Sequence, residues 1–284
     1  MSGAAGGQVR VGTSGWRYAS WRGDFYPRGL RQKDELAHLA SRLNTVEING
    51  SFYSLQTPES YERWRDATPD DFVFGVKGGR YLTHMLRLRD TERAMANFFA
   101  SGVLLLGGKL GPVLWQLPER LEFDPDLLER FCAMLPTTRR GAASLARRHD
   151  DKAKHTRIPG IPAGLDGVVR HALEPRHPSF GDDRAAEILR RHGVALVLAD
   201  TAGRFPVFDH ATAGFVYARL HGPEQLYWGG YDDDALHRWA ALIRRQAACG
   251  SAPRDVYVYF DNDADGRAPH DAEAMARILS GEGI

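Results

Sequence analysis

Side chains of the types used in acid/base catalysis recur in this chain where short hydrophobic runs end. They are three carboxylates, two arginines, a lysine, a histidine and two amides: Glu47, Glu174, Asp200, Arg176, Arg219, Lys77, His221, Asn49 and Gln116. Ionisable groups gathered around one opening shift one another's pKa values, and such clusters contain general acids and bases. The first functional hypothesis is therefore acid/base chemistry of the hydrolase or lyase type on a small polar or anionic ligand.

Eight β-branched or aromatic runs must position these residues, and segments of helical periodicity lie between most of them. The runs are Val9 to Gly15, Thr45 to Asn49, Phe72 to Lys77, Gly111 to Gln116, Val168 to Arg176, Ala195 to Asp200, Phe215 to His221 and Val256 to Asn262. Eight strand-loop-helix units predict an α/β fold of the (β/α)₈ TIM-barrel class, in one domain over residues 9–284. Catalytic groups of such barrels lie at the carboxyl ends of the strands, which form the rim.

Side chains alternate between the two faces of a strand, so the terminal residues that share a face can act together. Glu174 or Asp200 is the predicted base and His221 the acid or proton shuttle, with Glu47 completing the catalytic set. Three cations, Lys77, Arg176 and Arg219, are expected to stabilise negative charge on the ligand. Two structural alternatives stay open, namely an ion pair between Glu174 and Arg176 and one between Lys77 and Glu47.

A second hypothesis is that a divalent metal ion binds at the carboxyl ends of the same predicted strands. Glu174, His177, Asp200 and His221 are ligand types that suit a divalent cation. The sequence has no HExxH motif and no paired-histidine spacing, and it has no P-loop or GxGxxG fingerprint for a nucleotide cofactor. No cofactor is therefore predicted with certainty.

Composition limits the partners. The 284 residues are 43% hydrophobic and 26% charged, and 37 Lys plus Arg balance 36 Asp plus Glu. A net charge of +1 gives no global attraction to nucleic acid. No stretch approaches the roughly 20 apolar residues of a membrane span, so a cytoplasmic location without membrane partners is expected. Residues 1–8 are expected to form a flexible tail, and the sequence does not predict the oligomeric state.

The segment 136–167 is the main irregularity, a basic insertion between the fourth helix and the fifth strand. Between Arg139 and Arg157 it holds seven Lys or Arg, two His and two Asp. A phosphate-binding arm is one interpretation. A helix-to-strand connection should emerge opposite the rim, however, which favours a mobile, solvated insertion. The link 201–214 is too short for a full helix.

Short motifs spread along the whole chain resemble the YecE-like family, a bacterial family of domains of unknown function with a TIM-barrel fold. The matches are Gly12-Thr13-Ser14-Gly15-Trp16, Trp21-Arg22-Gly23 with Phe25-Tyr26-Pro27, Val46-Glu47-Ile48-Asn49 with Phe52-Tyr53, Val76-Lys77 with Thr83-His84, Lys109-Leu110-Gly111-Pro112 with Gln116-Leu117-Pro118, Glu174 with Arg176-His177-Pro178-Ser179, Arg219-Leu220-His221-Gly222, and Tyr257-Val258-Tyr259-Phe260 with Asn262-Asp263. Two departures from the family pattern bear on the site. Pro175 should end the fifth strand, and Asp261 adds a negative charge at the mouth.

The strand ends, their loops and these matches together give one set of ligand-binding residues. The set is Trp16, Asn49, Tyr53, Lys77, His84, Gln116, Arg176, His177, Arg219, Tyr231 and Asn262. Trp16 opens an aromatic loop that either plugs the barrel mouth or stacks on a sugar or base.

Two further functions stay open. One is a metal-dependent phosphodiesterase acting on nucleic acid, similar in outline to barrels of the endonuclease IV type. The other is a non-catalytic protein that binds an anionic metabolite or single-stranded nucleic acid. The fold class alone cannot decide between these functions, because barrels host many unrelated reactions.

Overall fold

The computed structural model describes residues 7–162, 164 and 166–281, which divide into two compact units. The first unit comprises Met1–Val46 and Ala195–Ile284, and the second comprises Glu47–Val194. Most of the expected flexible tail, residues 1–6, lies outside the described residues. Gln8 is held in place, because its backbone N–H donates to Asp255 Oδ1 at 2.9 Å. The expectation of one domain over 9–284 stays a prediction.

Parallel strands confirm the predicted α/β TIM-barrel fold. The strands of the first unit are β1 (Val9–Ser14), β6 (Ala195–Leu196), β7 (Leu198–Asp200), β8 (Phe215–Leu220) and β9 (Asp255–Phe260), and β2 (Thr45–Ile48) crosses the unit boundary. Hydrogen-bonded neighbours follow the order β2-β1-β9-β8-β7. The first strand of the chain therefore pairs in parallel with the last, from Val9 opposite Val256 to Thr13 opposite Phe260. Such a pairing is expected of a barrel and not of an open sheet.

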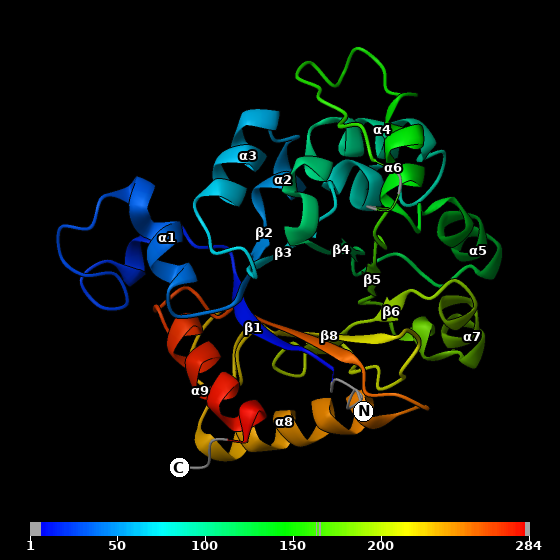
Figure 1. Cartoon of the computed structure of the whole chain (residues 1–284). Helices are drawn as coiled ribbons and strands as arrows, with labels where there is room; N and C mark the ends of the chain where they lie inside the picture. Colours follow the sequence, from blue (N-terminus) through cyan, green and yellow to red (C-terminus); the bar gives the residue numbers. More distant parts are fainter. Residues whose placement is uncertain (1–6, 163, 165, 282–284) are drawn as a thin grey trace, which may run out of the picture. The chain divides into compact units, whose positions relative to one another are not determined.

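Helices α1 (Glu35–Ala40), α8 (Asp233–Ala248) and α9 (Ala268–Ser280) accompany these strands. Figure 1 shows α8 and α9 side by side, and α9 also packs on β1. The sixth predicted strand is interrupted between β6 and β7 at Val197. Residues 201–214 contain no helix, as their length predicted. No helix in the described ranges has the length and apolar character that crossing a bilayer requires.

The second unit repeats the strand-helix pattern. Its strands are β3 (Val73–Lys77), β4 (Leu110–Gln116) and β5 (His171–Glu174), and its helices are α2 (Gly50–Tyr53), α3 (Pro58–Asp66), α4 (Glu92–Ala100), α5 (Pro125–Met134), α6 (Arg139–Ala146) and α7 (Asp183–Arg191). Strand β5 ends one residue before Pro175, which cannot donate to the ladder. In the parallel register of β4 and β5, Gln116 lies opposite Glu174. These two side chains therefore start from the same level of the sheet.

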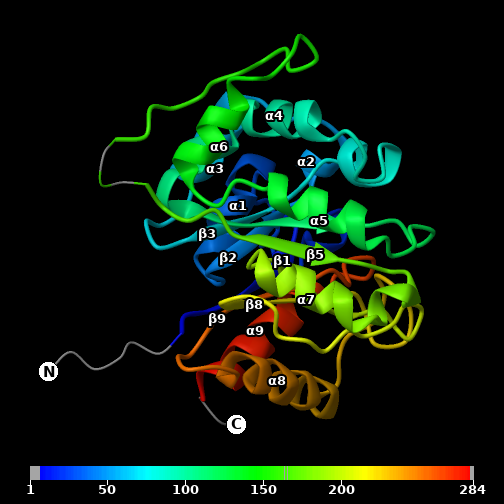
Figure 2. The ribbon, with the colours of Figure 1, turned by 90° about the vertical axis from the view of Figure 1, so that its right-hand side faces the viewer.

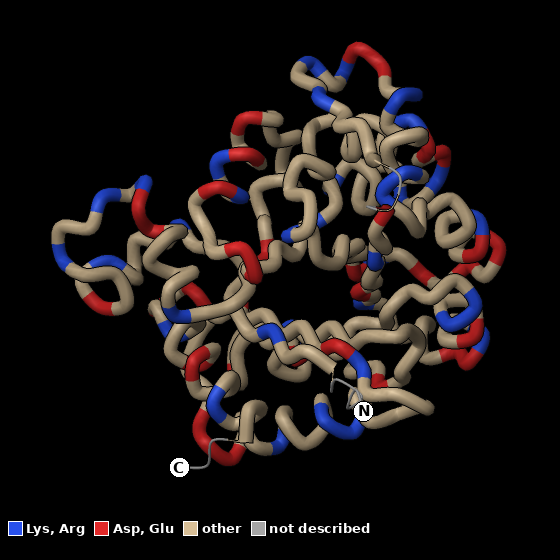
Figure 3. Tube along the Cα trace, viewed as in Figure 1, with Lys and Arg blue, Asp and Glu red and all other residues tan. Residues whose placement is uncertain are grey.

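The basic insertion is largely irregular, as predicted, but it contains helix α6. Thr138 begins this helix by accepting a hydrogen bond from Gly141 N at 3.0 Å, and the alanine-rich face of α6 packs beside α4 (Figure 2). Figure 3 shows basic segments interrupted by acidic ones along this stretch. Arg157 pairs with Glu62 and Glu59 of α3, at 2.6 and 3.1 Å. The basic groups are therefore partly neutralised by neighbouring helices, which weakens the phosphate-arm interpretation.

The position of the insertion differs from the expectation that it lies opposite the rim. Lys152 Nζ lies 5.7 Å from the centre of the Tyr81 ring, and Tyr81 follows the carboxyl end of β3 in a π-helical turn, Tyr81–Met85. The chain runs from α6 past α4 towards the segment that follows the carboxyl end of this strand, and Asn97 of α4 holds Asp150 there. The expectation that the insertion stays away from the carboxyl ends was wrong for this segment.

Candidate functional site at the carboxyl ends of the strands

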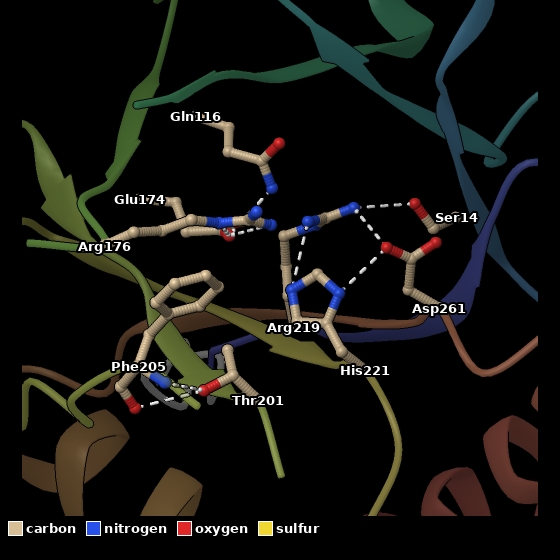
Figure 4. A network of polar contacts seen from close by, with 9 residues as sticks. All are labelled: Ser14, Gln116, Glu174, Arg176, Thr201, Phe205, Arg219, His221 and Asp261. Atoms are coloured by element: carbon tan, nitrogen blue, oxygen red, sulfur yellow. Dashed lines mark hydrogen bonds and ion pairs between the residues drawn. The ribbon is translucent and has the colours of Figure 1, made fainter. Parts of the chain in front are cut away.

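Arg219 is the centre of a buried polar network in the first unit. It lies on β8, and its side chain is fully buried. Its Nη2 donates to Ser14 Oγ at the end of β1, at 2.8 Å, and to Asp261 Oδ2 just after β9, at 3.1 Å. Figure 4 shows these side chains converging from three strands. We call Ser14, Arg219, His221 and Asp261 the arginine network.

His221 lies between two members of this network. Its Nε2 lies 3.2 Å from Arg219 Nη1, and its Nδ1 lies 2.9 Å from Asp261 Oδ2. A guanidinium group can only donate, so Nε2 is the acceptor in the contact with Arg219. Both ring nitrogens thus face partners within the network. His221 orients Arg219 and Asp261, and its predicted role as a proton shuttle gains no support from this geometry.

Asp263 is a second buried carboxyl next to the network. Neither of its side-chain oxygens has a hydrogen-bond donor within the usual distance among the described residues. Burial and the nearby Asp261 carboxylate raise the pKa of Asp263 well above its ordinary value, while Tyr18 and Arg219 oppose that shift. The protonated, neutral carboxyl is therefore the form that this site favours.

Asp263→Asn is expected to raise the free energy of unfolding by about 1–2 kcal/mol at pH 8, because the folded wild type favours a protonated carboxyl that the unfolded chain would ionise, and asparagine removes this cost. A folded-state pKa above the unfolded value means that the wild type loses stability as pH rises from about 4. The gain should therefore vanish near pH 3.5, where Asp263 is protonated in both states. Urea unfolding at the two pH values measures it. An equal effect at both would contradict the assignment.

Asp200, Tyr231 and Asn262 are tied to each other through loops of the first unit. Tyr231 Oη donates to Asp200 Oδ2 at 3.0 Å, and Asn262 Nδ2 donates to Gly229 O and to Asp271 Oδ2, each at 2.7 Å. Asn262 is fully buried, so it holds the loop after β8 in place. Asp200 is half-buried, and burial raises its pKa despite the hydrogen bond from Tyr231. Of the three, Asp200 retains the character of an acid/base group.

The aromatic loop after β1 is mostly a small core of its own. The rings of Trp21, Phe25 and Tyr26 lie 5.2 to 5.6 Å apart between centres, and all three side chains are buried. Trp16 is also buried, and its carbonyl oxygen accepts the Tyr26 hydroxyl at 2.7 Å. Stacking of a base or sugar on these rings would require the loop to open. The plug interpretation fits the observed packing better.

In the second unit, Glu174 is a buried carboxylate at the end of β5. Its Oε1 accepts from Gln116 Nε2 at 2.8 Å and from Arg176 Nε and Nη2, each at 3.3 Å (Figure 4). The Glu174–Arg176 ion pair considered from the sequence is therefore present. These contacts orient the Arg176 guanidinium group, and the role of Glu174 as a base stays a prediction.

Lys77 and His84 lie with Arg176 in a positively charged environment, and we call these three residues the cationic cluster. Lys77 Nζ lies 4.4 Å from the centre of the Phe52 ring, whose edge meets His84 with 5.1 Å between ring centres. Partial burial and then the charges of Lys77, Arg176 and Arg80 lower the pKa of His84 to about 4, and only Glu174 acts in the opposite sense. The imidazole is therefore neutral at pH 7. Its lowered pKa indicates a local excess of positive charge.

The remaining predicted residues have different surroundings. Glu47 is fully buried on β2, and Asn49 is half-buried just after that strand. Tyr53 is 72% exposed. His177 Nδ1 contacts Ser179 Oγ at 2.8 Å and accepts from Ser179 N at 3.3 Å, so it begins the short helical turn Pro178–Gly181. Among the residues that the structure describes, no three His, Cys, Asp or Glu side chains are grouped to hold a metal ion.

Four polar residues of these surroundings were absent from the predicted set. They are Ser14, Asp263, Asp271 and Arg80. Ser14, Asp263 and Arg80 stand within three residues of a strand end, so a wider window at each end would have found them. Asp271 lies on α9, and the sequence does not indicate its role, because a carboxyl group on an amphipathic helix is expected to face solvent. Asp261 was noted only as a departure from a family pattern, yet it joins Arg219 to His221.

The parallel strands of this protein, with helices between them and polar side chains at their carboxyl ends, place it in the α/β class of TIM barrels. The chain belongs to the family described as "Protein of unknown function DUF72", whose model matches residues 10–283. This confirms the resemblance to the YecE-like family.

Relatives and solved structures agree with that assignment. The chain is 24% identical to the UPF0759 protein YunF of Bacillus subtilis over 302 residues, covering 95% of this chain and 94% of that protein. It is 29% identical to the UPF0759 protein YecE of Escherichia coli K12 over 210 residues, which are 72% of this chain and 64% of that protein. The crystal structure of a DUF72 family protein from Thermotoga maritima matches 96% of this chain and 99% of that chain, with 24% identity and a TM-score of 0.74. One from Enterococcus faecalis covers 96% of each chain, with 17% identity and a TM-score of 0.71. These structures show the same fold.

Proposed function

We propose that the protein is an enzyme that transfers a proton to or from a small anionic ligand at the cationic cluster. The observation that carries this proposal is the packing of His84 against the Phe52 ring, with Lys77 Nζ 4.4 Å from the centre of that ring. The charges of Lys77, Arg176 and Arg80 act on this imidazole and help to lower its pKa. Lys77 stands at the end of β3 and Arg176 two residues after β5. The carboxyl ends of strands are where barrels of this class carry their active sites.

The cations supply the binding energy for an anionic group. Lys77 is buried except for 8% of its surface, and Arg176 keeps only 14% of its side chain exposed. Charges shielded from water in this way act more strongly on a ligand than charges at an open surface. Glu174, which itself accepts a hydrogen bond from Gln116, orients the guanidinium group of Arg176 before any ligand arrives. A carboxylate or phosphate group is the chemistry that such a pair of cations recognises.

His84 is the proposed proton-transfer group. With a pKa of about 4, the free enzyme holds a neutral but weakly basic imidazole. An anionic ligand beside Lys77 and Arg176 offsets their field and moves this pKa up towards neutrality, where proton transfer is most efficient. The imidazole then takes the proton of a C–H or O–H bond next to the anionic group. The electron pair stays on the ligand, and the same cations stabilise the charge that develops.

Turnover of a ligand panel tests the proposal. The protein is incubated in D₂O with small carboxylates and phosphate esters, and proton NMR follows loss of C–H signals by exchange or the formation of products. Wild type should act on at least one compound, and Lys77→Met should lower that rate about 100-fold, as loss of one preorganised charge-stabilising group does in other enzymes. Lys154→Met, on the exposed insertion, should keep the full rate.

Two outcomes would contradict the proposal. One is equal turnover by wild type and Lys77→Met. The other is tight binding of the panel without any exchange or product, which would leave the non-catalytic binding protein as the better account.

A further inference from the structure

A pocket of about 650 Å³ lies in the second unit, between the loops that follow β2 and β3 and helix α4. Its wall includes Phe52, Tyr53, Tyr81 and Met85. Eight large hydrophobic side chains are exposed among the residues that the structure describes, and four of them, including Tyr53 at 72% and Met85 at 65%, line this pocket. Contiguous exposed apolar side chains around a concavity of this size mark a ligand site more often than chance exposure does.

The charged groups of the pocket are of one sign. Arg80 and Lys152 line it, and none of its described lining residues is Asp or Glu. Lys152 is positioned over Tyr81 because its loop is fastened to α4. Asn97 Nδ2 donates to Asp150 Oδ1 at 2.8 Å, and the backbone N–H of Lys152 donates to the same oxygen at 3.0 Å. The basic insertion therefore contributes a preorganised cation to an aromatic pocket.

We propose that this pocket binds a small amphipathic anion: a flat aromatic body between Phe52, Tyr53 and Tyr81, with a carboxylate, sulfonate or phosphate group held by Arg80 and Lys152. Aromatic walls favour a flat ring by offset or edge contacts. The adjustable Met85 side chain fills the remaining space. None of Lys77, His84 and Arg176 lines the pocket, so this proposal does not rest on the reaction proposed above.

Fluorescence titration with 8-anilinonaphthalene-1-sulfonate, an aromatic anion, tests the charged side of the pocket. Wild type should bind one equivalent. Lys152→Glu should weaken binding about tenfold, because it replaces an attractive charge beside the sulfonate with a repulsive one. Lys154→Glu makes the same charge change two residues away, at an exposed residue that does not line the pocket, and should bind within about twofold of wild type.

A second pair of variants tests the aromatic side. Tyr81→Ala should also weaken binding about tenfold, whereas Trp228→Ala removes an exposed aromatic ring of the other unit and should have no effect. Arg176→Met changes the cationic cluster at a residue that does not line this pocket, and it should keep the affinity for the probe, which separates the two sites. Unchanged affinity in both Lys152→Glu and Tyr81→Ala would overturn the proposal, and so would an equal loss in Lys152→Glu and Lys154→Glu.

Discussion

Replacing Arg219 with methionine is expected to lower the free energy of unfolding by about 3–5 kcal/mol at neutral pH. The guanidinium is fully buried and donates to Ser14 and Asp261. Without it, the Asp261 carboxylate stays in the interior beside His221 and loses the guanidinium group that offsets its desolvation. Breaking one side of a buried ion pair costs more than the pair contributes, because the remaining charge is left uncompensated. Urea unfolding followed by circular dichroism measures the change.

Two variants make this result specific. Arg184→Met removes an exposed arginine that pairs with Asp182 at 2.7 Å, and it should cost less than about 1 kcal/mol. Adding Asp261→Asn to Arg219→Met should restore part of the lost stability, because the uncompensated charge is removed. A loss below 1 kcal/mol for Arg219→Met, or a double variant less stable than the single one, would show that the network is not the buried charge pair described above.

The eight hydrophobic runs predicted the strands closely because buried parallel strands are nearly continuous in β-branched and aromatic residues. Pro175 predicted where β5 ends, and the shortness of 201–214 predicted the missing helix. The sequence also predicts a helix from about Thr91 to Leu106, but α4 ends at Ala100. Gly102 takes a left-handed conformation with φ of 113°, after which the chain forms tighter 3₁₀ turns between Val103 and Lys109 that are interrupted at Gly107. A glycine near a helix end is a weak signal until its φ is known.

Side-chain alternation could predict which residues lie at strand ends. It could not predict which of these side chains form hydrogen bonds with neighbouring loops. Asn262 was predicted to bind ligand, and the structure shows that its amide nitrogen holds Gly229 and Asp271. His221 was predicted to move protons, yet both ring nitrogens face Arg219 and Asp261. These outcomes depend on loop conformation, which alternation does not encode. The helix α6 was missed for a related reason, since its start depends on Thr138 accepting from Gly141 among prolines and glycines that indicated irregular chain.

The second large expected effect is the low pKa of His84, and His171 in the same unit provides a matched comparison for it. Burial lowers the pKa of His171 to about 4 as well, although no charged side chain contributes there. His171 is held between Trp115 Nε1, at 3.2 Å, and the Pro136 carbonyl oxygen, at 2.8 Å. His84 owes part of its shift to Lys77, Arg176 and Arg80. An added anion should therefore change the pKa of His84 and leave that of His171 unchanged.

Titration of the histidine ring protons by NMR, with and without inorganic phosphate, tests most directly whether an anion-binding, proton-transferring cluster surrounds His84. We expect a pKa of about 4 for His84 in the free protein, an increase when phosphate is added, and a smaller increase in Lys77→Met. A His84 pKa near 6.5 in the free protein, or a value that phosphate moves no more than it moves His171, would contradict the account.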